Sequence, residues 1–262
     1  MSTLNPTKET IKLFAKQLRT PSFVHYEDVV RQLDAGQGYD HFLRDLMKRE
    51  VDQRQENQQR RRIKAAKFPF TKTLDEFDFS RLANVSSATL WELASGDFIA
   101  NRQNVVMIGN PGAGKSHLSI GLGMKACQAG FNVRFYTAAH LATELSEAMQ
   151  AHRLSRFEKS LSKIDLLIVD ELSYLTFNRH QSEMLFHIIS ERSERASIIV
   201  TTNLEFSRWT ELFENEMMVT ALIDRITFRS HILNMNVDAS YRLLQTTKGG
   251  HAHVDGRIGT HG

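Results

Sequence analysis

Residues 109–116 have the composition and spacing of a loop that binds phosphate groups. They read Gly-Asn-Pro-Gly-Ala-Gly-Lys-Ser, so glycines stand at the bends and a lysine and a serine follow them. Glycine lets backbone N–H groups approach a triphosphate that bulkier residues would hold away. Lys115 is expected between the β- and γ-phosphates, and the Ser116 hydroxyl is a suitable oxygen ligand for Mg²⁺. The sequence therefore predicts that ATP and Mg²⁺ bind here, through Gly109, Asn110, Pro111, Gly112, Ala113, Gly114, Lys115, Ser116 and His117.

The segments on either side of this loop support the prediction. Residues 105–108 are apolar, as in a buried strand, and the residues after the loop are compatible with a helix. Strand, loop and helix are the context in which this motif binds nucleotides, because the helix N-terminus adds partial positive charge beneath the phosphates. An ordinary glycine-rich turn is the alternative.

A second pair of chemically competent residues, Asp170 and Glu171, follows the apolar run 166–169 directly. Such a run is typical of a parallel strand buried on both faces, whose carboxyl end emerges at the edge of the sheet where ligands bind. We expect Asp170 to hold the hydrated Mg²⁺. Glu171 is expected to accept a proton from the attacking water, a role worth about 10²- to 10⁴-fold in rate.

The predicted catalytic residues are Glu171, Asn203 and Arg225. Asn203 follows the strand-like residues 197–202, where its amide can orient the attacking water; taken alone it would be an ordinary turn asparagine. Arg225 lies in a helix-like segment. It either pairs with Asp224 or another neighbour, or reaches the phosphates of an adjacent subunit as an arginine finger, worth about 10³- to 10⁵-fold in rate. The predicted metal ligands are Ser116 and Asp170.

The composition limits the class of protein. The chain has 262 residues, of which 41% are hydrophobic, and a net charge of +3. This charge alone indicates no particular partner. The single cysteine, Cys127, excludes an intrachain disulfide framework and is expected to be a small buried residue. No apolar stretch reaches the length of about 20 residues that spans a bilayer. We therefore expect a soluble, cytoplasmic protein.

Residues 1–67 predict a small helical domain and a basic connector. Apolar residues recur at helical spacing in three segments, which Pro21 and the glycines near residue 37 separate. Three short helices give only a thin core. From residue 52 the third helix loses its apolar stripe. A basic run follows, which is either a solvated connecting arm or a contact for a phosphate backbone or an acidic partner. It consists of Arg60, Arg61, Arg62, Lys64 and Lys67.

Residues 68–245 alternate between strand-like and helix-like segments. This pattern predicts an α/β domain with a mostly parallel, five-stranded sheet between helices. Residues 74–79 are expected to form an edge strand or a lid over the adenine. Residues 150–163 carry a basic outer face, for which an ordinary solvated helix is the alternative. Residues 246–262 are rich in glycine and histidine and are expected to be a disordered tail.

With these motifs in hand, the sequence resembles the IstB-like helper ATPases that accompany transposases of bacterial insertion sequences. They are a branch of the AAA+ superfamily close to the DnaC-type helicase loaders. The likeness extends over about residues 68–244 and includes the helical N-terminal segment. It lies in residues 109–116, 166–174, 201–203, 224–225 and 240–242.

The resemblance implies a P-loop AAA+ core. It implies the roles given above for Lys115, Ser116, Asp170 and Glu171. It implies that Asn203 is the first sensor and that Arg225 is an arginine finger acting on a neighbouring subunit. It also implies self-assembly on duplex DNA and contact with a transposase. The sequence also departs from the family pattern. A full C-terminal lid is not expected, and Arg242 is a weak candidate for a second sensor. Ser173 and Thr176 stand where a glycine and a proline are expected, and residues 237–239 replace a glycine-containing turn.

Three functions fit these residues. The leading hypothesis is an ATP-dependent, DNA-binding helper of an insertion-sequence transposase, which assembles as a homo-oligomer on duplex DNA and hydrolyses ATP to regulate transposition. Because no base-reading helix is recognisable, we expect DNA binding to be independent of sequence. The alternative is a DnaC-like replicative helicase loader, which should prefer single strands. A small-molecule kinase is less compatible, because Glu171 beside Asp170 is suited to activating water.

Overall fold

The computed structural model describes residues 6–33, 38–79, 85–174, 176–192, 195–213 and 215–236. The chain divides into two compact units, Met1–Arg61 and Arg62–Gly262. The boundary expected after residue 67 stays a prediction. Arg242, residues 237–239 and the tail 246–262 lie outside the described residues.

The first unit is helical and has the thin core expected from the sequence. It contains α1 (Pro6–Gln17), the 3₁₀ helix η1 (Pro21–His25), α2 (Tyr26–Gln32) and most of α3 (Tyr39–Ala66). Among its described apolar side chains only Ala15, Val29 and Leu46 are buried. The buried carboxylate of Glu50 holds the start of η1, because it accepts hydrogen bonds from the Ser22 backbone N–H at 3.1 Å and from the Ser22 hydroxyl at 2.5 Å.

Helix α3 continues through the region that lacks an apolar stripe. The sequence from residue 52 is rich in Gln and Arg, which favour helix even without a buried face. In the basic run that follows, Arg60, Arg61 and Lys64 are exposed.

The second unit is built on a five-stranded parallel sheet. Its strands are β1 (Asn104–Ile108), β2 (Val133–Thr137), β3 (Leu166–Asp170), β4 (Ser197–Thr202) and β5 (Ser230–Asn234). Their order is β2-β3-β4-β1-β5, and every pairing is parallel. Every residue of β1, β3 and β4 is buried, as the apolar runs predicted.

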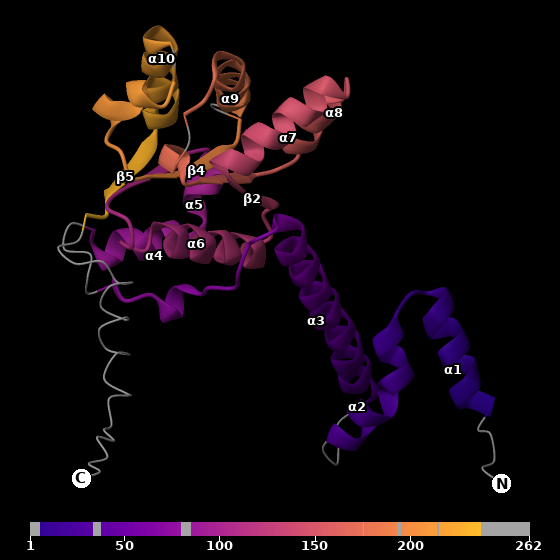
Figure 1. Ribbon diagram of the computed structural model, residues 1–262. Coiled ribbons are helices and arrows are strands. Elements are labelled where there is room, and N and C mark those ends of the chain that lie inside the picture. Colours follow the sequence, from indigo (N-terminus) through magenta and orange to yellow (C-terminus); the bar gives the residue numbers. More distant parts are fainter. Residues whose placement is uncertain are drawn as a thin grey trace, which may run out of the picture. The chain divides into compact units, whose positions relative to one another are not determined.

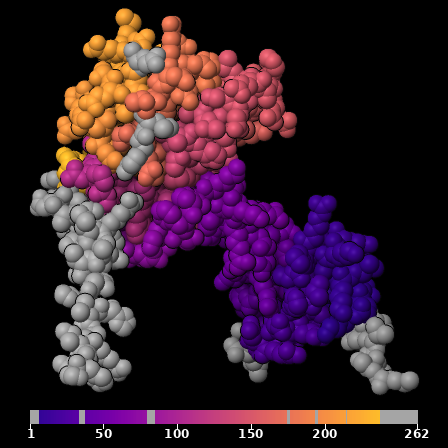
Figure 2. All heavy atoms as spheres, in the orientation of Figure 1, coloured from indigo at the N-terminus to yellow at the C-terminus, as the bar shows by residue number. Residues whose placement is uncertain are grey.

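Helices cover both faces of this sheet (Figure 1). On one face α4 (Ser87–Ser95) and α6 (Lys115–Ala129) pack against side chains that include Val105, Met107 and Ile168. On the other face α7 (Ala138–Gln150), α9 (Arg179–Arg192) and α10 (Glu216–Thr227) pack against the alternate residues, including Val106 and Val169. The short helix α5 (Asp97–Ala100) precedes β1, and α8 (Leu154–Leu161) follows α7. In Figure 2 the residues of α7 to α10, pink to orange, form one continuous layer of atoms.

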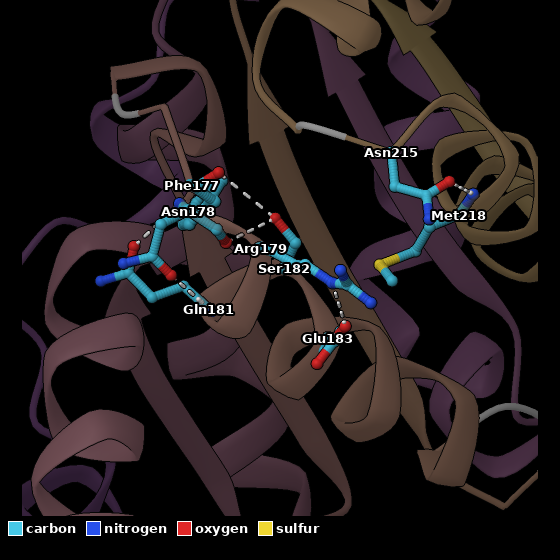
Figure 3. Close-up of polar contacts among 8 residues, drawn as sticks. All are labelled: Phe177, Asn178, Arg179, Gln181, Ser182, Glu183, Asn215 and Met218. Atoms are coloured by element: carbon cyan, nitrogen blue, oxygen red, sulfur yellow. Dashed lines mark hydrogen bonds and ion pairs between the residues drawn. The ribbon is translucent and has the colours of Figure 1, made fainter.

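Side-chain caps determine where α9 and α10 begin (Figure 3). Asn178 Oδ1 accepts a hydrogen bond from the Gln181 backbone N–H at 2.9 Å, and Gln181 Oε1 accepts one from the Asn178 N–H at 3.2 Å. This reciprocal pair satisfies N–H groups that the first turn of α9 leaves over. Asn215 caps α10 in the same way, through a 3.1 Å bond from the Met218 N–H.

Residues 74–79 do not form the edge strand considered above, and together with the preceding residues they make up the segment 68–79. They contain the 3₁₀ helix η2 (Leu74–Glu76) and pack on α6. Leu74 fills the space beside Gly121, where an added Cβ would lie 2.5 Å from it, and Phe68 does the same beside Gly123, at 2.9 Å. The two glycines therefore allow this segment to approach α6 closely.

Cys127 is fully buried in α6, as expected. Burial raises the pKa of its thiol to about 11, so the thiol stays protonated and unreactive at neutral pH. Within the described residues, no helix combines the length and the apolar composition that crossing a membrane requires.

Candidate functional site

The phosphate-type loop joins the carboxyl end of β1 to the start of α6. Gly112 and Gly114 adopt φ values of +80° and +90°, which a residue with a Cβ adopts only with strain. The first hydrogen bond characteristic of α6 runs from the Leu118 N–H to the Gly114 carbonyl at 2.9 Å. The N–H groups of Ser116 and His117 precede this bond, at the positively polarised end of the helix, where an anion can bind them.

Neighbouring segments hold the loop from two sides. An added Cβ on Gly109 would lie 2.6 Å from the Met235 backbone, and the Asn110 N–H donates to Asn236 Oδ1 at 3.1 Å. An added Cβ on Gly114 would lie 2.8 Å from the Phe77 ring. The glycines at 109 and 114 are therefore needed for close approach by β5 and by residues 68–79.

Lys115 lies at the centre of the site, with only 8% of its surface exposed. Its ammonium donates to the Gly109 carbonyl at 2.5 Å, the Asn110 carbonyl at 2.9 Å and Asn203 Oδ1 at 2.7 Å. The structure thus brings together two residues that are far apart in the sequence, of which Lys115 was predicted to bind the phosphates and Asn203 to orient the attacking water. A buried ammonium surrounded by oxygens suits the binding of a polyphosphate at the same point.

The predicted metal ligands are in direct contact. The Ser116 hydroxyl donates to Asp170 Oδ1 at 3.1 Å. A hydroxyl and a carboxylate oxygen are ligands that Mg²⁺ prefers, and here they meet next to the lysine-bearing loop. The residues present therefore fit a Mg²⁺–nucleotide complex.

Glu171 follows Asp170 in an unusual backbone conformation, with φ at +60°. Its N–H donates to Thr201 Oγ1 at 2.9 Å, and the Thr201 hydroxyl donates to Asp170 Oδ1 at 2.5 Å. Ser173 lies in η4 (Leu172–Tyr174) and accepts a 2.9 Å hydrogen bond from the Asn203 N–H. Sequence reasoning gave no role to the Thr201 hydroxyl and noted Ser173 only as a departure from the expected glycine. The available signal in the sequence was the pair of hydroxyl residues that directly follows the apolar residues of β4.

His117 points toward a different part of the molecule. Its Nε2 lies 2.9 Å from the Thr73 carbonyl oxygen, and its ring meets the Phe77 ring edge-on, with centroids 5.2 Å apart. Its side chain therefore contacts residues 68–79.

Arg225 does not join the other predicted catalytic residues. Its carbonyl lies 3.4 Å from the side-chain amide of Asn104, the first residue of β1. The phosphate loop follows the last residue of β1, about 13 Å further along the strand. The Arg225 guanidinium lies over the Phe186 ring, 5.0 Å from its centroid, and bonds the Ala221 carbonyl at 3.2 Å. Among the described residues it has no ion pair with Asp224 or with any other carboxylate.

Comparison with solved structures identifies the fold. AMPPCP-bound DnaA from Aquifex aeolicus matches with a TM-score of 0.56 at 17% identity, over 72% of this chain and 58% of that chain. DnaI matches with a TM-score of 0.52 at 14% identity, over 62% of this chain and 90% of that chain. The chain thus shares the fold of these proteins, and the predicted α/β core with its parallel five-stranded sheet is confirmed.

Comparison of sequences identifies the family. The model described as IstB-like ATP binding protein matches residues 14–249. The insertion sequence IS21 protein of Pseudomonas aeruginosa is 37% identical over 227 residues, which cover 86% of this chain and 85% of the relative. The insertion sequence IS5376 protein of Geobacillus stearothermophilus is 36% identical over 205 residues, which cover 78% and 81%. The chain therefore belongs to the family of IstB-like ATP-binding proteins.

Proposed function

We propose that this protein is an ATP-dependent, DNA-binding helper of an insertion-sequence transposase, which assembles on duplex DNA and hydrolyses ATP to regulate transposition. One observation carries the ATPase part of the proposal. At one edge of the sheet, the Lys115 ammonium is hydrogen-bonded to the Asn203 amide, and the next residue, Ser116, is hydrogen-bonded to Asp170. The insertion-sequence part rests on family membership and on the names of the relatives.

The residues of the site have separate roles in this proposal. Lys115 and the loop N–H groups hold the β- and γ-phosphates, and Glu171 accepts a proton from the attacking water, which Asn203 orients. Ser116 and Asp170 would hold Mg²⁺, which would neutralise charge on the phosphates. Glu171 suits its role because its backbone departs from the strand direction directly after Asp170.

The position of Arg225 supports the proposal that the protein assembles into a homo-oligomer. Its backbone lies near the beginning of β1, at the edge of the sheet opposite the subunit's own phosphate loop. An arginine so placed serves a nucleotide held by a neighbouring subunit more readily than its own. We test this with Arg225→Ala, which should bind ATP and fail to hydrolyse it. Mixing it with Glu171→Ala should restore part of the turnover, because the Arg225→Ala subunits keep Glu171 and the Glu171→Ala subunits keep the finger. No recovery in the mixture would argue for a role within one subunit.

The DNA part of the proposal is supported by basic side chains on and around α8. Arg156 and Lys159 lie within α8, and Arg153 and Lys163 flank it at the same spacing of three to four residues, which is the spacing of one helical face; all four, and His152, are exposed. Within the described part of the chain, none of the arginines and lysines among them forms an ion pair. Exposed cations at this spacing are suited to contact with a phosphate backbone. The set consists of His152, Arg153, Arg156, Lys159 and Lys163.

Filter binding of duplex and single-stranded DNA, with and without ATP, tests the proposal. We expect ATP to strengthen duplex binding, and Lys115→Ala to abolish that dependence. Strict preference for single strands would contradict the proposal and favour the helicase loader. Failure of the purified protein to bind ATP would exclude both functions.

The salt dependence of duplex affinity tests the α8 surface. Replacing Arg153, Arg156 and Lys159 with glutamine should reduce the slope of log K against log salt by about 2.7, because each phosphate contact contributes about 0.9. The matched control removes three arginines that are already ion-paired, Arg179, Arg195 and Arg208. An equal change in both variants would show that only total charge matters. A third variant that neutralises Arg60, Arg61 and Lys64 determines whether the basic run of α3 contributes.

A further inference from the structure

We infer that Thr201 is a positioning residue of the site, whose hydroxyl sets the orientation of both adjacent carboxylates, Asp170 and Glu171. This inference rests on the proposed ATPase function and extends it to a residue that would not itself touch the nucleotide.

The hydroxyl of Thr201 makes two hydrogen bonds of opposite sense. It donates to Asp170 Oδ1 at 2.5 Å and accepts from the Glu171 backbone N–H at 2.9 Å. The same Asp170 oxygen accepts from the Ser116 hydroxyl at 3.1 Å. The Thr201 hydroxyl oxygen therefore links the side chain of Asp170 to the backbone of Glu171. Through Asp170 it is also linked to Ser116 of the phosphate loop.

The register of the sheet explains why this residue must supply the link. β3 and β4 pair from Leu166 with Ser197 to Val169 with Val200, and the next step places Asp170 beside Thr201. Beyond this point Glu171 turns into the left-handed region, at φ +60°. That conformation has an energetic cost for a non-glycine residue and persists only where neighbours enforce it. The hydrogen bond from the Glu171 N–H to Thr201 offsets part of this cost and fixes the direction in which the Glu171 side chain leaves the strand.

The burial of Thr201 means that no solvent can replace its hydroxyl. It is 1% exposed, so loss of its hydroxyl would not be repaired by bulk water. Ser197, at the other end of the same strand, is also fully buried, but its hydroxyl donates to the Phe98 carbonyl, away from the site. Ser197 is therefore the natural control for the structural cost of losing a buried hydroxyl from β4.

The experiment compares Thr201→Val, Thr201→Ser and Ser197→Ala with the wild type. Valine keeps the shape of threonine and removes the hydroxyl, whereas serine keeps the hydroxyl. Three quantities are measured for each: the melting temperature, the turnover of ATP, and the Mg²⁺ concentration that half-saturates binding of a fluorescent ATP analogue.

We expect Thr201→Val to lower kcat about 100-fold, the loss typical of a reacting group misplaced by about 1 Å. We also expect it to raise the half-saturating Mg²⁺ concentration about tenfold, as for loss of an outer-shell partner of a metal ligand. Thr201→Ser, which keeps the hydroxyl, should match the wild type in kcat and in the half-saturating Mg²⁺ concentration. Ser197→Ala should lower the melting temperature and leave both of these quantities unchanged.

Each outcome decides the inference. It is overturned if Thr201→Val leaves the Mg²⁺ midpoint within twofold of the wild type, or if Ser197→Ala shifts that midpoint as far. The inference is also overturned if Thr201→Ser is folded but its Mg²⁺ midpoint is shifted as far as that of Thr201→Val. If the wild type binds the analogue with Mg²⁺ but never hydrolyses ATP, the ATPase proposal fails, and the Mg²⁺ titration still decides the role of Thr201.

Discussion

Exchanging Asn203 for aspartate should stabilise the protein without nucleotide and weaken its affinity for ATP. Asn203 Oδ1 accepts a 2.7 Å hydrogen bond from the buried Lys115 ammonium. Aspartate has nearly the same shape and would convert this bond into an ion pair. Because the ammonium must turn to the phosphates when ATP binds, any group that holds it more tightly opposes binding.

The size of the effect follows from the surroundings of the ammonium. Two unit charges 4 Å apart near a protein surface attract by about 4 kcal/mol, and desolvation and screening remove a large part of this. A net gain of about 2 kcal/mol corresponds to an affinity for ATP that is about 30-fold weaker. It also corresponds to a rise of about 4–8 °C in the melting temperature of a domain of this size.

Two companion variants separate this effect from simpler ones. Asn203→Ala removes the acceptor, so it should lower the melting temperature, leave ATP affinity unchanged or higher, and reduce turnover. Asn236→Asp places the same charge against the phosphate loop, through the bond from the Asn110 N–H, without contacting the lysine. Thermal melting and titration with a fluorescent ATP analogue measure both quantities. The reasoning fails if Asn203→Asp binds ATP as tightly as the wild type, or if Asn236→Asp weakens binding equally.

Three further predictions concern single positions. Glu171→Gln should bind ATP normally and lower turnover by about 10²- to 10⁴-fold in a phosphate-release assay; normal turnover would exclude Glu171 from the chemistry. Gly114→Ala should lower the melting temperature more than Gly130→Ala does, because both residues have positive φ but only the first would place a Cβ against Phe77; equal shifts would refute this. Burial would raise the pKa of Glu50, but the hydrogen bonds that it accepts outweigh burial and hold the pKa below its ordinary 4.5. The N-terminal helices should therefore keep this contribution above pH 4.5 and lose it as pH falls through the lowered pKa. Circular dichroism during acid titration measures this loss, and equal acid sensitivity in Glu50→Gln would contradict it.

The strand ends were the part of the site that the sequence predicted best. Apolar runs followed by polar residues placed Asp170 and Asn203 at the carboxyl ends of buried parallel strands, and such ends share one edge of a sheet. That geometry makes the 2.7 Å contact between Lys115 and Asn203 understandable although 88 positions separate them.

The side-chain contacts of the strand ends could not be predicted in the same way. Thr201 and Thr202 are both buried, and periodicity does not show which hydroxyl faces Asp170, because that depends on the register between β3 and β4. Residues 74–79 alternate apolar and polar side chains as a strand would. They form a 3₁₀ turn instead, because the glycines of α6 let them pack against that helix. Tertiary packing outweighed local pattern in this segment.

The packing of residues 62–79 has a practical consequence for dissecting the protein. Two glycines inside α6, Gly121 and Gly123, weaken that helix by about 1 kcal/mol each relative to alanine. Leu74 and Phe68 fill the hollows that they leave. Ala66 is fully buried in the same cluster. An expression fragment that began at the first strand would remove these side chains, exposing apolar surface along the helix that presents Lys115. A minimal nucleotide-binding fragment should therefore start before the last turn of α3, at or upstream of Arg62.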